Sequence, residues 1–92
     1  MILRIMEEGQ LEIPDGALDE LNELDEELIR AVEAGDEEHF RTSMEALLGR
    51  VREVGKPVPE DYLGPSDVFL PSADSTIADV RHLMDEEGLL PG

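Results

Sequence analysis

Residues 55–92 read GKPVPEDYLGPSDVFLPSADSTIADVRHLMDEEGLLPG, and this stretch decides how the chain closes its fold. The two prolines of KPVP exclude a helix at its start and favour an extended segment, because each proline restricts the residue before it. The run DVFL at residues 67–70 predicts a short strand. Thr76 and Asp79 can then form a capping box, which predicts a last helix that ends at Gly88.

The opening residues of the chain predict two further strands. Residues 2–6 (ILRIM) are rich in β-branched side chains, and residues 11–13 (LEI) alternate apolar and polar. The turn residues EEGQ between them include Gly9, which can take the positive φ of a tight turn. We therefore expect a β-hairpin over residues 2–13.

Two amphipathic helices are expected between the hairpin and residue 55. Asp15 can cap the first helix, and Gly35 with Asp36 forms a joint where that helix ends and the second begins. The apolar stripes at helical spacing are Leu18, Leu21, Leu24, Leu28 and Val32 in the first helix, and Phe40, Met44, Leu47, Leu48, Val51 and Val54 in the second. Because the joint is so short, the two helices must be antiparallel neighbours.

Together these elements predict an α+β fold in the order β-β-α-α-β-α. The sheet is expected to have two or three strands, made of the hairpin and the strand at residues 67–70. The helical hairpin and the C-terminal helix would cover one of its faces. A chain of 92 residues has room for one small core, so we expect a single domain over residues 1–92.

Composition narrows the classes of function. The chain has 24 acidic and 7 basic residues, a formal net charge of -17, and no cysteine or tryptophan. Such a surface repels the phosphates of nucleic acids and of anionic lipids. The lack of cysteine removes thiolate catalysis and disulfides. No apolar run is long enough to span a membrane or to act as a secretory signal, so we expect a cytoplasmic protein.

The sequence predicts no catalytic or metal site. His39 and His82 lie far apart, and neither belongs to a His-x-x-x-His pair. The acidic run Asp25-Glu26-Glu27 lacks the alternating ligands and central glycine of an EF-hand loop, and we interpret it as a solvated helix face. The serines stand in no nucleophile elbow, and the chain has no glycine-rich phosphate loop. We expect no enzymatic activity, no cofactor and no metal.

Short fragments spread over nearly the whole chain form a recognisable series. They are EGQ (8–10), LDELNELD (18–25), AVEAGD (31–36), Phe40, GKPVP (55–59), PSD (65–67), LP (70–71) and EGLLP (87–91). In order and spacing this series resembles the PspA-associated family (PspAA). The resemblance implies a small accessory domain that acts with phage shock protein A (PspA), a long helical protein that polymerises on stressed inner membranes. It implies no catalytic residues.

The resemblance implies a non-enzymatic adaptor or regulator of the membrane-stress response. Its expected partners are a PspA-like coiled-coil protein and membrane-embedded sensor proteins, with the inner membrane reached through the partner and not by insertion. The candidate partner-binding residues are four acids of the first helix and three apolar residues near loops or the chain end: Asp19, Glu23, Glu26, Glu27, Phe69, Leu89 and Leu90. The acids could engage basic stretches of the helical partner, while the apolar groups fix the register.

Other classes of function stay open on the sequence alone. An oligomerisation module would form a homo-oligomer through an apolar interface without any partner. An acidic anti-activator would mimic nucleic acid and sequester a basic DNA-binding protein, which requires acids in two phosphate-like rows. A small hydrolase would need a pocket that holds His39 or His82 beside several carboxylates.

Overall fold

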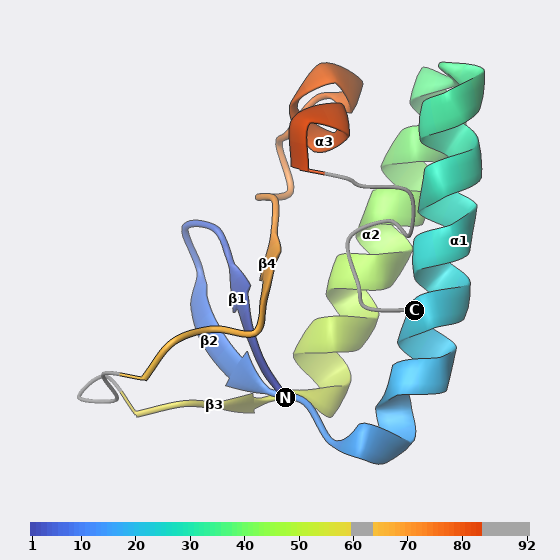
Figure 1. The fold of residues 1–92 in the computed structure, drawn as a ribbon. Helices are drawn as coiled ribbons and strands as arrows, with labels where there is room; N and C mark the ends of the chain where they lie inside the picture. Colours follow the sequence, from blue (N-terminus) through green and yellow to red (C-terminus); the bar gives the residue numbers. More distant parts are fainter. Residues whose placement is uncertain (60–63, 84–92) are drawn as a thin grey trace.

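A four-stranded sheet and two long antiparallel helices form the two layers of the fold (Figure 1). The structure is a computed structural model that describes residues 1–59 and 64–83. Strand β1 (Ile2–Ile5) pairs antiparallel with β2 (Gly9–Glu12), which confirms the hairpin. Strand β4 (Val68–Leu70) lies parallel to β1, and β3 (Lys56–Pro57) lies antiparallel to β2, so the strand order is β3-β2-β1-β4.

The sheet has one strand more than the two or three that the sequence predicts. The segment Lys56–Pro57, expected only to be extended, pairs with Leu11 and Glu12 as strand β3. Two residues are too few to show a period of two, and Pro57 has no N–H for the ladder, so no local pattern indicates a strand here. The predicted α+β class and element order otherwise hold, with β3 inserted before β4.

The joint between the two long helices is built as predicted. Helix α1 (Leu18–Ala34) ends at Gly35, whose φ of 68° is left-handed, and helix α2 (Glu37–Val54) begins after Asp36. The Asp36 side chain accepts a hydrogen bond from the backbone N–H of His39 at 3.0 Å. This arrangement satisfies backbone groups that a helix end otherwise leaves without partners.

The start of α1 differs from the prediction that Asp15 caps it. A short 3₁₀ turn, η1 (Asp15–Ala17), precedes the helix, and Ala17 occupies the cap position without any side-chain hydrogen bond. The prediction is wrong because Asp15 lies inside this extra turn. Its carboxylate is therefore too early in the chain to meet the first free N–H groups of α1.

The C-terminal helix of the described chain is α3 (Ile77–Leu83), and its capping box is confirmed. The backbone N–H of Thr76 donates to Asp79 Oδ2 at 3.1 Å, and the N–H of Asp79 donates to Thr76 Oγ1 at 3.2 Å. Arg81 then donates from Nη2 to the carbonyl oxygen of Val32 at 2.8 Å, which ties α3 to the last turns of α1. The predicted end of this helix at Gly88 lies outside the described residues.

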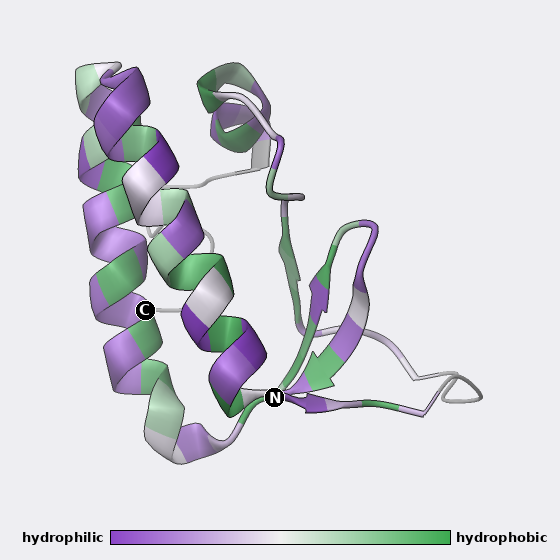
Figure 2. Cartoon of the chain, turned by 180° about the vertical axis from the view of Figure 1, so that it is seen from behind, coloured by the Kyte–Doolittle hydropathy of each residue, from purple (hydrophilic) through white to green (hydrophobic). Residues whose placement is uncertain are grey.

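The core lies between the inner face of the sheet and the helices. Its buried apolar residues are Leu3, Ile5, Ile13, Leu21, Leu28, Ala31, Val32, Phe40, Met44, Leu47, Leu48, Val51, Val68, Leu70, Ile77 and Val80. In Figure 2 both long helices alternate hydrophobic and hydrophilic residues along their length, as expected of helices with one buried side. The predicted stripe residues Leu18, Leu24 and Val54 pack at the margin of this core.

Candidate functional site

An exposed row of carboxylates runs along the solvent side of α1. Asp19, Glu23 and Glu26 are spaced by four and three residues, which places them on one side of the helix. We call these three residues the acidic face. Asp19 and Glu23 form no hydrogen bond or ion pair within the described chain, and Glu26 only approaches Arg30, with 3.9 Å between its Oε2 and Arg30 Nη2. The acidic face therefore carries nearly uncompensated negative charge.

The fourth candidate acid, Glu27, lies beside the acidic face and is engaged within the molecule. Its Oε2 lies 3.1 Å from His39 Nε2 on α2, and its Oε1 accepts a hydrogen bond from Arg30 Nη1. The contact with His39 connects the two long helices near their joint, and the contact with Arg30 lies within α1. A partner that used Glu27 would have to compete with both of them.

The acidic run that contains Glu26 and Glu27 is not a solvated face throughout. Asp25 is only 1% exposed, whereas its two neighbours are exposed. The interpretation is wrong for Asp25 because successive helix residues point in directions about 100° apart, and Asp25 falls on the side that also buries Leu21 and Leu28. The prediction that Asp25 is exposed followed from its acidic residue type alone. The position of Asp25 around the helix places its side chain on the buried side instead.

Helix α1 is held to α2 by a second set of surface charges. Arg50 on α2 forms ion pairs with Glu20 on α1 and with Glu53, the latter at 2.8 Å between Nη1 and Oε2. Its Nε lies against Glu20 without hydrogen-bond geometry, while its Nη2 donates to Glu20 at 3.3 Å. The hydrogen bond to Glu20, more than that to Glu53, raises the pKa of Arg50. Glu20 is thus occupied, unlike the acidic face next to it.

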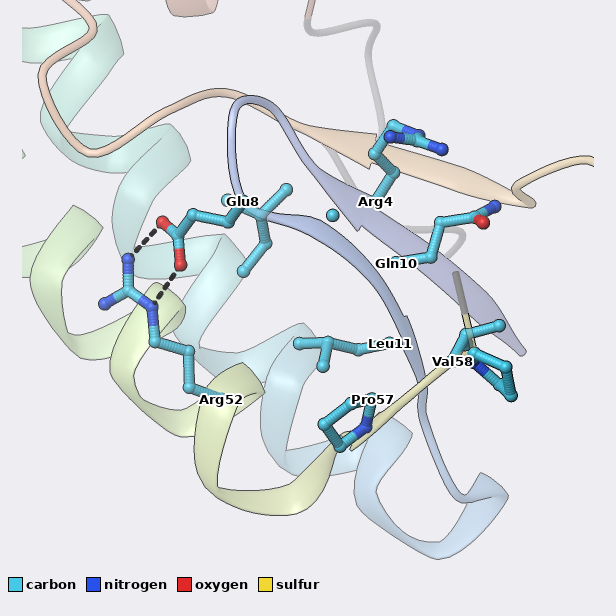
Figure 3. A pocket seen from close by; sticks show the side chains of 11 residues that line it. Arg4, Glu8, Gln10, Leu11, Arg52, Pro57 and Val58 are labelled. Atoms are coloured by element: carbon cyan, nitrogen blue, oxygen red, sulfur yellow. Dashed lines mark hydrogen bonds and ion pairs between the residues drawn. The ribbon is translucent and has the colours of Figure 1, made fainter. Parts of the chain in front are cut away.

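A hollow of about 540 Å³ opens at the edge of the hairpin, between β2, the end of α2 and the segment after β3 (Figure 3). One wall is the ion pair of Glu8 and Arg52, in which Arg52 Nε donates to Glu8 Oε1 at 2.8 Å and Nη2 donates to Oε2. The hydrogen bond from Arg52 lowers the pKa of the Glu8 carboxyl. The same ion pair holds the Glu8 side chain in place as part of the wall.

The other side of the hollow combines polar and apolar groups. Leu11, Pro57 and Val58 contribute apolar surface, and Arg4 and Gln10 stand on the far side from the Glu8–Arg52 pair (Figure 3). None of these residues is predicted by the sequence to be a site residue. The alternation in ILRI does indicate that Arg4 faces away from the core, but nothing local indicates the Glu8–Arg52 pair, which joins residues 44 positions apart.

The apolar candidates separate in the structure. Phe69 is 51% exposed on β4, opposite Arg4 in the ladder, and lies on a different element from the acidic face. Met6 is the other large hydrophobic side chain exposed in the described chain, at 45%. Leu89 and Leu90 lie outside the described residues. The structure therefore does not bring Phe69 together with the candidate acids of α1.

The two histidines do not share a site. His39 contacts Glu27, and His82 is exposed on α3. Within residues 1–59 and 64–83, no three side chains of His, Cys, Asp or Glu converge to hold a metal ion. No helix in the same ranges is both long and apolar enough to cross a membrane.

Comparison with known proteins bears on the chain as a whole. A family model described as PspA-Associated protein matches residues 1–92. The match covers every element from β1 to α3, and it confirms the resemblance noted in the sequence. No curated protein and no solved structure matches the chain.

Proposed function

Because the chain belongs to the PspA-associated protein family, we propose that it is a non-enzymatic adaptor that binds PspA in the membrane-stress response. The observation that carries this proposal is the match of the family model to all 92 residues. The adaptor works in the cytoplasm and reaches the inner membrane and its sensor proteins through PspA. Its net charge of -17 disfavours direct contact with anionic lipid.

The acidic face of α1 supports the electrostatic part of this contact. Its carboxylates are exposed and almost unpaired, and the helix beneath them is fixed because Leu21 and Leu28 are fully buried in the core. A rigid row of like charges attracts a segment of opposite charge and orients it without a large entropic cost. The matching element on PspA is a basic stretch of one of its helices.

Size-exclusion chromatography with light scattering tests the proposal. The chain is run alone and mixed with the PspA homologue of the same organism, at low and at high salt. We expect co-elution at low salt and a weaker complex at high salt, because exposed charge pairs are screened. Separate elution at both salt concentrations would refute binding. A stable multimer of the chain alone would favour the oligomerisation module instead.

A charge-matched pair of variants locates the contact. The test variant D19N/E23Q/E26Q removes three charges from the acidic face, and the control variant E37Q/E38Q/E45Q removes three exposed charges from α2. We expect the test variant to bind PspA roughly tenfold more weakly, since exposed charge pairs contribute about 0.2–1 kcal/mol each. The control should bind like the wild type. Equal weakening in both variants would mean that net charge matters and the acidic face does not.

A further inference from the structure

The face of the sheet that points away from the helices has its own composition. Leu3 and Ile5 of β1 are buried in the core, so the alternation of the strand turns Arg4 to the opposite side. Met6 follows the strand as the first residue of the turn and is exposed. The register then places Gln10 of β2 and Phe69 of β4 on either side of Arg4. The Gln10 side chain is engaged by the loop before β4, since its Nε2 donates to Ser66 Oγ at 2.7 Å and to the Gly64 carbonyl oxygen at 3.4 Å. We call Ile2, Arg4, Met6 and Phe69 the open face.

Arg4 at the centre of the open face has no acidic partner. Within the described chain it forms no hydrogen bond or ion pair, although it is only half-exposed and the protein contains 24 acids. Arg30, Arg50 and Arg52 are each bonded to a glutamate, and Arg81 donates to the Val32 carbonyl oxygen. Arg41 on α2 is the other arginine of the described chain without a partner, but it is exposed on a helix and not half-buried in the sheet. Both cross-strand neighbours of Arg4 are uncharged. Its guanidinium therefore retains five donors for an outside group.

Two carboxylates lie near Arg4 in the sheet, and neither stands directly opposite it. One is bonded to the backbone, and the other faces Lys56. The Oδ2 atom of Asp67 accepts a hydrogen bond from the backbone N–H of Ile2 at 2.9 Å. Glu12 stands one row further along β2, opposite Lys56. Lys56, the second base in this region, faces Glu12 across the ladder, whereas Arg4 faces a carboxylate on neither neighbouring strand.

Apolar surface surrounds this arginine. Phe69 and Met6, at 51% and 45% exposure, are the large hydrophobic side chains that the described chain leaves in solvent. Phe69 lies opposite Arg4 in the ladder, and Met6 stands two residues after Arg4 in the chain. Arg4 and Gln10 also line the hollow at the hairpin edge, which continues past Val58 and Leu11 (Figure 3). The open face thus combines one unpaired guanidinium, two exposed apolar side chains and an adjoining recess.

This combination specifies the chemistry of an occupant. A guanidinium binds a carboxylate through two parallel hydrogen bonds, and apolar neighbours strengthen the pair by excluding water. A polyanion such as nucleic acid or an anionic membrane would meet a single unpaired arginine on this face of a chain of net charge -17, and repulsion would dominate. A partner segment with a single carboxylate among apolar side chains meets no such penalty.

We propose that the open face is a second docking surface, which binds an amphipathic helix of the partner through a carboxylate on Arg4 and apolar side chains on Phe69 and Met6. The inference rests on the proposed function, since the helix belongs to the PspA-type partner. The open face offers a positive charge to the partner, whereas the acidic face offers negative charges. Two surfaces on different layers of the fold would let one adaptor hold two helices of an assembly.

The direction in which one substitution changes the affinity distinguishes docking on this surface from general electrostatic attraction. Arg4→Gln makes an already acidic chain more acidic. If the partner were held only by attraction between its basic residues and the acids of this chain, Arg4→Gln would leave binding unchanged or tighten it. If Arg4 receives a carboxylate, the same substitution weakens binding.

The experiment measures the Kd for the purified PspA homologue of the same organism. We expect Arg4→Gln and Phe69→Ala each to raise the Kd roughly tenfold, as for central contacts of an interface, and Arg4→Lys to recover part of the loss. The matched control is Arg41→Gln, which removes an exposed base from α2 that has no partner in the described chain. Thermal melting of each variant checks that the fold is intact.

Several results would overturn the inference. If the wild type binds and Arg4→Gln binds as tightly or more tightly, the open face is not a docking surface, while the proposed function stands. If the wild type does not bind PspA at all, both fall. Self-association of the chain alone that is lost in Phe69→Ala would assign the face to a second copy. Binding to phosphatidylglycerol vesicles that is lost in Arg4→Gln would assign it to lipid phosphate.

Discussion

Gly55 is the residue at which the chain passes from α2 into β3, and it is packed on three sides. A Cβ atom at this position would lie 2.8 Å from the Val51 carbonyl oxygen and 3.0 Å from side-chain atoms of Ile13 and Leu11. We predict that Gly55→Ala lowers the free energy of unfolding by roughly 1–3 kcal/mol, because the backbone oxygen cannot move aside cheaply. Urea unfolding monitored by circular dichroism measures the change.

The control for this substitution is Gly49→Ala in the interior of α2. A Cβ atom there meets nothing within 4 Å, and alanine is favoured over glycine in a helix by about 0.5–1 kcal/mol. The two glycine substitutions should therefore change stability in opposite directions. Stabilisation by Gly55→Ala would show that the end of α2 is packed differently.

The Glu8–Arg52 pair gives stability a dependence on pH. The hydrogen bond from Arg52 lowers the pKa of Glu8 below 4.5, its value in the unfolded chain. The pair therefore stabilises the fold at pH values above 4.5, and this contribution is lost as the pH falls through the lower folded pKa. Both side chains are partly exposed, Glu8 at 39% and Arg52 at 44%, so the pair stabilises the fold by at most about 1 kcal/mol.

A comparison of neighbouring glutamates tests this pair. We predict that Glu8→Gln is less stable than Glu7→Gln at pH 7, by up to about 1 kcal/mol, because only Glu8 loses an ion pair. Both variants remove one charge from the same turn, so net charge is matched. Chemical unfolding at a series of pH values should show the two converging below pH 4.5. A gap that stays constant with pH would contradict the assignment.

At the scale of elements, the start of α2 depends on one side chain. Asp36 accepts the hydrogen bond from the N–H of His39 at 3.0 Å. We predict that Asp36→Ala costs about 1 kcal/mol of stability, while Asp36→Asn, which keeps an acceptor oxygen, costs less. Thermal melting of both variants measures the difference. Equal losses of stability would mean that the negative charge near the helix terminus stabilises α2, and that the hydrogen bond of the cap does not.

The elements that sequence reasoning found are those with strong local signals. Each of these signals is formed by residues that are close together in the sequence. They are the apolar stripes of α1 and α2, the Gly35–Asp36 joint and the Thr76–Asp79 capping box. Strand β3 was not predicted from the sequence, because its two residues become a strand only when β2 lies beside them. The misassigned cap at Asp15 has a similar cause, since local residue type does not reveal the 3₁₀ turn in front of α1.

The candidate site was less accessible to sequence reasoning than the fold. Residue type indicated the acids of α1, but only the packing shows that Glu27 contacts His39 and that Asp25 is buried. The open face forms when β4 joins β1 in parallel and brings Phe69 beside Arg4, 65 residues earlier in the chain. Such non-local pairings leave no periodic mark in the sequence.

At the scale of the whole molecule, a net charge of -17 on 92 residues makes self-repulsion a general cost of folding. We predict that the melting temperature rises by roughly 5–10 °C between 10 mM and 1 M sodium chloride, as screening relieves about 1–2 kcal/mol of repulsion. The variant E37Q/E38Q/E45Q, with three fewer negative charges, should show a smaller rise. A melting temperature that falls with salt would mean that favourable ion pairs outweigh the repulsion.

Binding of this protein to PspA, as proposed, can be measured in a titration. The fluorescently labelled chain is titrated with the PspA homologue of the same organism at 50 mM and at 500 mM sodium chloride, and the Kd is read at each. We predict saturable binding at low salt that weakens at high salt, because exposed charges of the acidic face contribute to it. Absence of saturable binding at either salt concentration would contradict the assignment of the chain as a PspA adaptor.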